Sequence, residues 1–144
     1  MDDRPSSSVR LTWQDGFRFD SEDTHGHSIT LDAPQSEEDS FEGFMPGDML
    51  LTALAGCSGM DVVNILSRQR QKVEGLEISV NGRQNPDPPW AWEDVAIHYT
   101  PRGSGLNPRL VERAIDLSEN KYCSIGATIG GVTRVSSSFE IIES

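Results

Sequence analysis

Residues 45–66, "MPGDMLLTALAGCSGMDVVNIL", constrain the fold more than any other stretch of this sequence. Pro46 suits the first turn of a helix, where its missing N–H group has no helical partner to lose. Apolar residues continue as far as Leu66, and the polar, basic stretch 67–72 follows, where positive charge favours the end of a helix. We predict one helix of about 25 residues, buried on more than one face.

Shorter segments on both sides of this helix alternate apolar and polar residues, which is the period of a half-buried β-strand. Three of them precede the helix, at 9–13, 16–20 and 27–32, and predict a three-stranded meander with one buried face. After the helix we expect strands at 76–82 and 95–100, an amphipathic helix capped by Asn107 with Pro108 at its first position, and a final strand at 133–142.

The predicted order β-β-β-α-β-β-α-β indicates an α+β fold, with antiparallel sheet packed around one long central helix. A length of 144 residues predicts a single domain that spans residues 1–144.

The charge balance argues against polyanionic partners. The sequence has 12 basic and 23 acidic residues and a net charge of −11, whereas nucleic acid and anionic lipid both require a basic surface. We expect no membrane span, because Asp48 and Asp61 interrupt the longest apolar run, and we recognise no signal segment at the N-terminus. The expected compartment is a reducing cytoplasm, where a cysteine pair is more often catalytic, redox-sensing or inert than structural.

Few residues offer recognisable chemistry. The three histidines, His25, His27 and His98, form no metal-ligand spacing with the two cysteines, so we expect neither a metal nor another cofactor. The sequence has no Gly-rich phosphate loop after a strand and no serine-nucleophile turn. The remaining candidates are Cys57, inside the predicted long helix, and Cys123, in "NKYCSIG".

A buried cysteine often packs as a small hydrophobic residue, and composition alone leaves that interpretation of Cys57 open. Small residues surround it in "LAGCSG", which lets another element or a substrate come close. Cys123 lies in a short Gly-rich segment after a helix, where a resolving thiol has room to move. Both observations favour a chemical role.

The sequence resembles the OsmC/Ohr superfamily of osmotically induced and organic hydroperoxide resistance proteins, and within it the OsmC-like branch. The resemblance covers about residues 9–143 and is carried by "GFRF", "HSITLDAP", "PGDMLLTALAGCSGMDVVNIL", "VEGLEISVNGR", "VERAIDLSENKYCS" and the final strand. It implies an intertwined homodimer with two active sites at the subunit interface, each on a long central helix. It also implies thiol peroxidase activity towards organic hydroperoxides.

The resemblance gives each cysteine a role. Cys57 is implied to be the peroxidatic thiol, whose thiolate attacks the O–O bond, releases an alcohol and becomes a sulfenic acid. Cys123 is implied to be the resolving thiol, which condenses with that sulfenic acid to a disulfide. An external dithiol of the lipoyl type, or a small thiol, would then reduce the disulfide.

Such chemistry requires a cation near Cys57, because an ordinary thiol is only a few per cent ionised at neutral pH. Cys57 lies eleven residues after Pro46, about 16 Å along the helix, so the helix dipole contributes little. The resemblance points to Arg18 in "GFRF", and Arg83 at the end of "SVNGR" is an alternative. The competing interpretation of Arg18 is a solvated strand arginine.

The resemblance also implies an acid near the start of the helix that orients the arginine. The hydroperoxide resistance branch has Glu directly after the Pro, whereas this chain has Gly47 there and Asp48 next, as in the OsmC-like branch. Nine residues at about 100° each place Asp48 and Cys57 on opposite sides of one helix. Asp48 therefore acts through an arginine or across the dimer interface, or it only stabilises the helix N-terminus. Asp61 shares the face of Cys57 and would oppose a thiolate unless an arginine pairs with it.

Three functions remain open at this point. The first is a cysteine-based peroxidase, an enzyme that consumes organic hydroperoxides. The second is a redox-sensing or apolar-ligand-binding stress protein with little turnover, which Gly47 and the shorter acid at Asp48 favour. The third is a purely structural role for Cys57 and Cys123.

Overall fold

The computed structural model describes residues 2–144, and it divides into two compact units. The first ends at Leu50 and the second comprises Leu51–Ser144, so the division falls inside the long helix.

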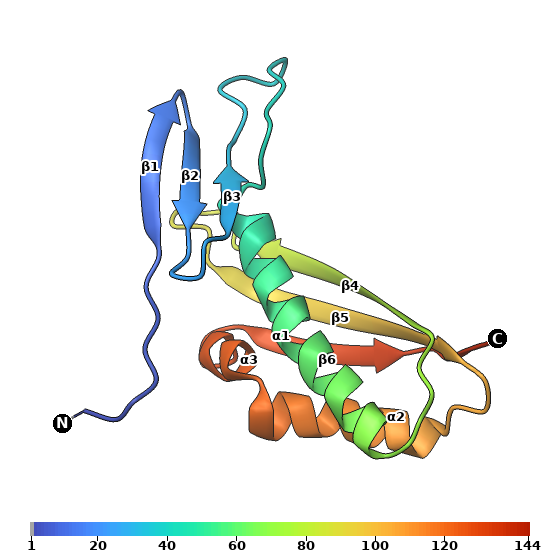
Figure 1. Cartoon of the computed structure of the whole chain (residues 1–144). Helices are drawn as coiled ribbons and strands as arrows, with labels where there is room; N and C mark the ends of the chain where they lie inside the picture. Colours follow the sequence, from blue (N-terminus) through green and yellow to red (C-terminus); the bar gives the residue numbers. More distant parts are fainter. Residues whose placement is uncertain (1) are drawn as a thin grey trace. The chain divides into compact units, whose positions relative to one another are not determined.

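The first unit contains a three-stranded antiparallel sheet in the order β1-β2-β3, which confirms the predicted meander (Figure 1). Its strands are β1 (Arg10–Asp15), β2 (Arg18–Glu22) and β3 (Ser28–Leu31). Trp13 pairs with Phe19, and Phe19 pairs with Leu31, so these three side chains share one face of the sheet.

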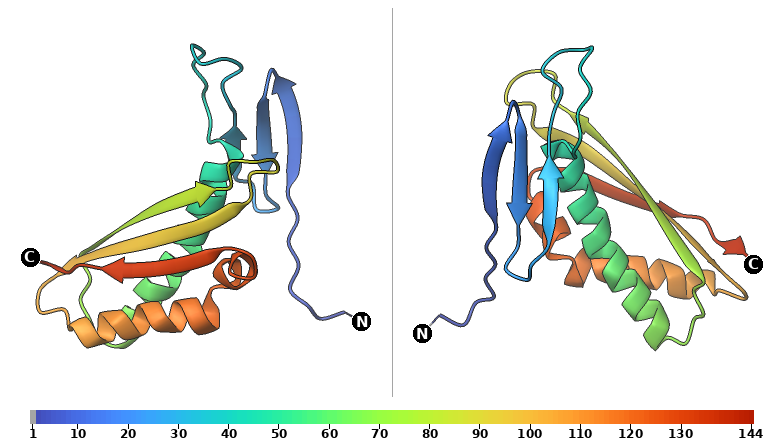
Figure 2. Two further views of the ribbon diagram at one scale, coloured as in Figure 1. Left: turned by 180° about the vertical axis from the view of Figure 1, so that it is seen from behind. Right: turned by 45° about the horizontal axis from the view of Figure 1, so that its top comes forward.

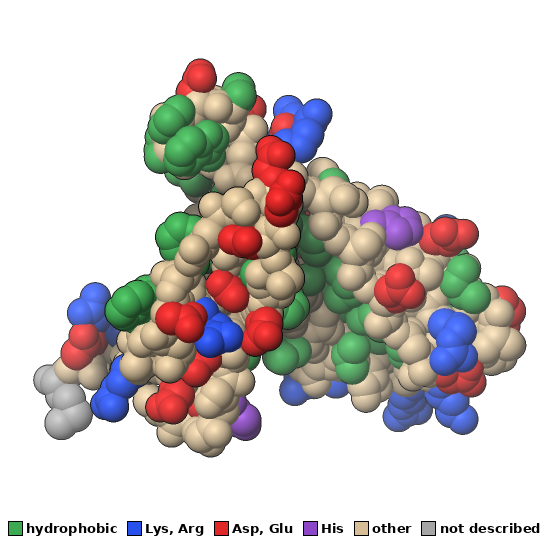
Figure 3. All heavy atoms as spheres, turned by 90° about the horizontal axis from the view of Figure 1, so that it is seen from above, with side chains coloured by type: hydrophobic (Ala, Val, Ile, Leu, Met, Phe, Trp, Pro, Cys, Tyr) green, Lys and Arg blue, Asp and Glu red, His purple; other side chains and the backbone are tan. Residues whose placement is uncertain are grey.

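The expectation of a buried face on this meander is wrong for the single chain. Trp13 is 61% exposed, and Leu11, Phe19 and Ile29 on the same face are exposed as well. The alternating pattern identified the apolar face correctly, but the described chain does not cover it. Figure 3 shows hydrophobic side chains open to solvent among acidic ones.

The long helix α1 (Pro46–Arg68) begins at Pro46 and ends in the basic stretch, as predicted. Its buried residues within the second unit form one stripe: Leu54, Ser58, Gly59, Val62 and Leu66. The predicted burial on more than one face is wrong for the single chain, because Met60 on the other side is 77% exposed and Val63 is also exposed.

By length and composition alone α1 is also apolar enough to cross a membrane, although we expected Asp48 and Asp61 to prevent this. The core helix of a soluble protein passes the same test, but such a helix is mostly buried, and only 28% of the apolar window of α1 is buried in this chain. Length and composition are therefore weak evidence that α1 crosses a membrane. The exposed apolar side of α1 is a surface that another molecule could cover.

The sheet of the second unit is mixed. The hairpin β4 (Gly75–Gln84) and β5 (Trp92–Gly103) is antiparallel, whereas β6 (Arg134–Phe139) and the short β7 (Ile142–Glu143) lie parallel to β5. The crossover from β5 to β6 contains α2 (Pro108–Leu117), the π-helical turn η1 (Ser118–Tyr122) and α3 (Ser124–Ile129). The α+β class is confirmed, and the parallel strand follows from this helical crossover. The cap is confirmed too, since the Asn107 side chain accepts from the Arg109 N–H.

The core of the second unit lies between this sheet and two helices. Figures 1 and 2 show α1 and α2 on the same face of the sheet. Buried side chains of β5 point towards them at every second position, starting with Val95, Ile97 and Tyr99. The fully buried apolar residues of the helices that meet them include Leu54, Val62, Leu66, Val111 and Ala114.

A matched pair of valines tests this core. Val111 on α2 is 0% exposed and Val132 is 89% exposed. We expect Val111→Ala to lower the free energy of unfolding by about 2 kcal/mol and the Tm by roughly 4–8 °C, because it removes buried methyl groups and leaves a cavity. Val132→Ala should shift the Tm by less than about 1 °C. Equal losses in thermal melts of the two variants would contradict this assignment of the core.

Candidate active site

The second unit brings Cys57 and Cys123 together. Cys57 is half-buried on α1, one residue before the buried Ser58, and Cys123 lies 66 positions later, between η1 and α3. The Cys57 thiol lies close enough to the Cys123 thiol to raise its pKa. Both are free cysteines, so the structure describes the dithiol form of the pair.

The π-helical turn η1 sets the position of Cys123. The Cys123 N–H donates to the Ser118 carbonyl at 2.8 Å, a bond that spans five residues and widens the end of the α2 segment. Cys123 is then the N-cap of α3, and its Sγ accepts from the Gly126 N–H at 3.2 Å. The thiol is therefore fixed by a wide turn before it and a helix start after it.

Burial, the Cys57 thiol and the Asp61 carboxylate together raise the pKa of the Cys123 thiol to about 11. The Gly126 N–H acts in the opposite direction but does not prevail. Cys123 is consequently a neutral thiol at pH 7.

A chain of buried hydroxyl groups runs beside the two cysteines. The Tyr99 hydroxyl is 2.5 Å from Ser58 Oγ, which is 3.0 Å from Ser118 Oγ, and Ser118 Oγ donates to Asp61 Oδ2 at 2.9 Å. Either hydroxyl of the Tyr99–Ser58 pair can be the donor, and Ser118 is the donor towards Asp61. The chain connects β5, α1 and η1.

The Asp61 carboxylate is not isolated beside the thiols, because its Oδ2 accepts a hydrogen bond from the Ser118 hydroxyl. The expectation that it opposes a thiolate at Cys57 stays a prediction; the carboxylate does raise the pKa of Cys123. Burial is the main cause that raises the pKa of Tyr99 to about 12; Glu119, Cys123 and Asp61 act in the same direction, and the hydrogen bond with Ser58 acts against them.

The other predicted site residues are on other elements or in the first turn of α1. Arg18, on β2, is half-buried and forms ion pairs with Glu42 at 3.1 Å and Asp15 at 3.5 Å. Asp48 lies in the first turn of α1. Both belong to the first unit, and their action on Cys57 stays a prediction. The alternative Arg83, at the end of β4, is mostly exposed and pairs with Asp94 at 2.9 Å.

Sequence reasoning missed the hydroxyl chain and Glu119. Serine at position 58, four residues after Leu54 on the buried stripe, was a usable signal, because a buried hydroxyl needs a partner. Tyr99, at an inward-facing position of β5, gives the same signal. Glu119 carries no such signal; its Oε1 is buried without a hydrogen-bond partner, and burial raises its pKa. Across residues 2–144 no group of three or more His, Cys, Asp or Glu side chains is placed to hold a metal ion.

The burial of Tyr99 predicts a late titration of its hydroxyl. We expect the absorbance near 295 nm to show one tyrosine that ionises only around pH 12, because burial opposes the phenolate. Tyr99→Phe should abolish this late transition, and Tyr122→Phe should keep it, which provides the matched control. Loss of the late transition in Tyr122→Phe instead would refute the assignment.

Comparisons with known proteins identify the family. The OsmC-like protein family matches residues 36–138. The chain is 31% identical to protein YhfA of Escherichia coli K12 over 134 residues, 93% of this chain and 97% of YhfA. Its fold is similar to that of a hypothetical protein from Aquifex aeolicus VF5, with 28% identity, a TM-score of 0.86, and coverage of 98% of this chain and 99% of that one.

A further similar structure is described as an organic hydroperoxide resistance protein OsmC and predicted redox protein from Legionella pneumophila. The identity is 17%, the TM-score is 0.70, and the match covers 94% of this chain and 97% of that chain, so it shows a shared fold. The family match and the YhfA relationship together cover the helix that carries Cys57 and the turn that carries Cys123. The chain therefore belongs to the OsmC-like protein family.

Proposed function

We propose that this protein is a thiol-dependent peroxidase that reduces organic hydroperoxides. The observation that carries the proposal is the proximity of the Cys57 and Cys123 thiols, which come from distant parts of the chain and interact within the second unit. A disulfide between them therefore requires little rearrangement of the second unit. The description of the Legionella structure as an organic hydroperoxide resistance protein supports the substrate class.

The two thiols differ in a way that assigns their roles. Cys123 is neutral at pH 7, because its pKa is raised to about 11, and so it is a poor first nucleophile. Cys57 is the half-buried member of the pair. The Cys57 thiolate attacks the O–O bond of ROOH, becomes Cys57–SOH, and releases the alkoxide, which is protonated to the alcohol. Cys123–SH then condenses with Cys57–SOH to give the disulfide and water.

Activation of Cys57 needs a positive charge beside its sulfur, because an ordinary thiol is only a few per cent ionised at neutral pH. We assign the activation to Arg18, oriented by an acid that we take to be Asp48. Glu42 and Asp15 already pair with the Arg18 guanidinium, so they hold it in a defined position.

The active protein in this proposal is a cytoplasmic homodimer that an external dithiol regenerates. The exposed apolar face of the meander, which includes Trp13, and the exposed side of α1, which includes Met60, are surfaces that a second copy would cover. Covering them also accounts for the apolar character of α1 without a membrane.

One observation favours a second candidate, a redox sensor with little turnover. The groups around Cys123 in the second unit raise the pKa of this thiol. A thiol that reacts slowly suits a sensor. The cysteine chemistry is the same in both cases, and the rate of turnover distinguishes them.

Substitution of the cysteines tests the proposal. We expect Cys57→Ser to lower the consumption of cumene hydroperoxide by at least about 100-fold, because no other group replaces the nucleophile. Cys123→Ser should retain the first oxidation but stop at the sulfenic acid or beyond. In the unsubstituted protein one equivalent of peroxide should remove two hydrogens and link Cys57 to Cys123, as measured by peptide mass spectrometry. Consumption that survives Cys57→Ser contradicts the peroxidase, and a disulfide without turnover favours the sensor.

Replacing Arg18 tests its role in activation. We expect Arg18→Met to lower the rate of alkylation of Cys57 at pH 7 at least about tenfold, which corresponds to one pKa unit, and to move the midpoint of the alkylation profile upward. Arg10→Met on the neighbouring strand is the control and should leave the profile unchanged. An unchanged profile in Arg18→Met would make Arg18 a strand arginine that only pairs with acids.

A further inference from the structure

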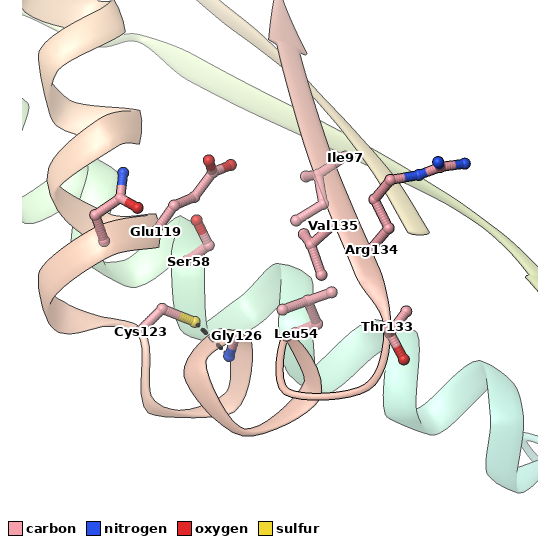
Figure 4. A pocket seen from close by; sticks show the side chains of 11 residues that line it. Leu54, Ser58, Ile97, Glu119, Cys123, Gly126, Thr133, Arg134 and Val135 are labelled. Carbon is pink, nitrogen blue, oxygen red and sulfur yellow. Dashed lines mark hydrogen bonds between the residues drawn. The ribbon is translucent and has the colours of Figure 1, made fainter. Parts of the chain in front are cut away.

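A cavity of about 280 Å³ opens beside Cys123 within the second unit. Figure 4 shows Leu54, Ile97 and Val135 as its apolar wall, with Ser58, Glu119 and Thr133 among its polar residues. Cys123 lines the cavity, whereas Cys57 is not among its lining residues.

The cavity gives small molecules a route to an otherwise inaccessible sulfur. Cys123 is only 4% exposed, and Figure 4 shows its Sγ directed towards Gly126 inside the cavity. A thiol that attacks a disulfide must approach the attacked sulfur from the side opposite the leaving sulfur. A cavity that Cys123 lines and Cys57 does not line suits attack on Cys123 with Cys57 as the leaving group.

We propose that this cavity admits the thiol reductant, which attacks the Cys123 sulfur of the oxidised pair and releases Cys57. The inference rests on the proposed function, because it requires the Cys57–Cys123 disulfide. The reductant is a small dithiol: its first thiolate forms a mixed disulfide with Cys123, and the electron pair of the broken S–S bond leaves on Cys57. The second thiol of the reductant then displaces Cys123, which takes up a proton, and the reductant departs as its own disulfide.

The properties of the leaving thiol agree with this direction. Exchange is faster when the departing thiol has the lower pKa. Attack on Cys57 would expel Cys123 into an environment that raises its pKa to about 11 and therefore disfavours the thiolate. Attack on Cys123 avoids expelling that thiol in the first step. In the proposed dimer a second copy also covers the α1 face beside Cys57, which leaves the cavity as the open route.

Glu119 determines which reductants the cavity accepts. Its Oε1 is buried without a hydrogen-bond partner among the described residues, Ser137 interacts with the same carboxyl group, and Figure 4 shows the side chain at the cavity. Arg134 also contributes to the lining, but its guanidinium points away in Figure 4 and pairs with Asp94. An anionic thiol would meet the acid without a compensating cation. The free Oε1 can instead accept from a hydroxyl or amide group, so the cavity favours an uncharged reductant.

Mapping the mixed disulfide tests which sulfur is attacked. The protein is oxidised with diamide, treated briefly with the uncharged monothiol 2-mercaptoethanol, quenched with acid and digested. We expect the adduct, extrapolated to zero reaction time, on Cys123 at least ten times as often as on Cys57. An adduct mainly on Cys57, or failure of diamide to link the two cysteines, overturns the inference. Diamide replaces the peroxide, so a protein that lacks peroxidase activity can still pass this test.

Filling the cavity tests the route. Val135→Phe places a larger side chain in the wall of the cavity. We expect this variant to slow the reduction of the disulfide by dithiothreitol at least ten times more than it slows the oxidation of the two thiols. Ser136→Phe, on the same strand but with an exposed side chain on the opposite face, is the control and should leave reduction within about twofold of the unsubstituted protein. Equal rates of reduction in the two folded variants overturn the route, and a Val135→Phe variant that fails to fold leaves the adduct map as the deciding result.

The charge of the reductant tests Glu119. After correction for the thiolate fraction, we expect 2-mercaptoethanol to reduce the disulfide at least about threefold faster than 3-mercaptopropionate. In Glu119→Gln we expect the ratio of these two rates to move closer to one. An unchanged ratio in Glu119→Gln overturns the role assigned to this acid.

Discussion

The packing of one stripe of α1 against β5 is the constraint on which the site depends. Leu54, Val62 and Leu66 are buried in the same core as Val95, Ile97 and Tyr99. Their burial fixes the rotation of the helix about its axis, because turning it would expose the stripe to water. Ser58 lies within the stripe, and Cys57, one residue earlier and about 100° around the helix, lies at its edge. The position of the sulfur is therefore a consequence of hydrophobic burial.

The polar groups beside this stripe fix the position of α1 more closely than apolar packing alone. A hydrophobic stripe tolerates small sliding movements, whereas the chain from Tyr99 through Ser58 and Ser118 to Asp61 requires each hydroxyl to meet its partner. A buried hydroxyl without a partner costs about 1–3 kcal/mol, so a shift of α1 relative to η1 is opposed at each bond. Ser118 has a second role, because its carbonyl accepts the N–H of Cys123. The residue that holds Asp61 thus also places the second thiol.

Periodicity and helix signals predicted most of the elements, since Pro46, Asn107 and the alternating strands act through their neighbours in sequence. The parallel β6 was missed because strand direction depends on the crossover and not on the strand's own pattern. The burial of the meander was overestimated because a pattern identifies an apolar face without stating which molecule covers it. The pairing of Cys57 with Cys123 was expected from the resemblance, whereas the partners of Ser58 and Asp61 depend on contacts 41 to 60 residues apart, which no local spacing encodes.

The exposed apolar surfaces and the chemistry of the thiols both favour a partner that covers the exposed side of α1. Burial and the nearby Asp61 carboxylate raise the pKa of Cys123, so this thiol stays neutral within the second unit. The same unit leaves Met60 and Val63 uncovered on the helix that carries Cys57. In the proposed homodimer a second copy would cover that side of α1, so it would change the dielectric environment of Cys57 and could bring a guanidinium to its sulfur.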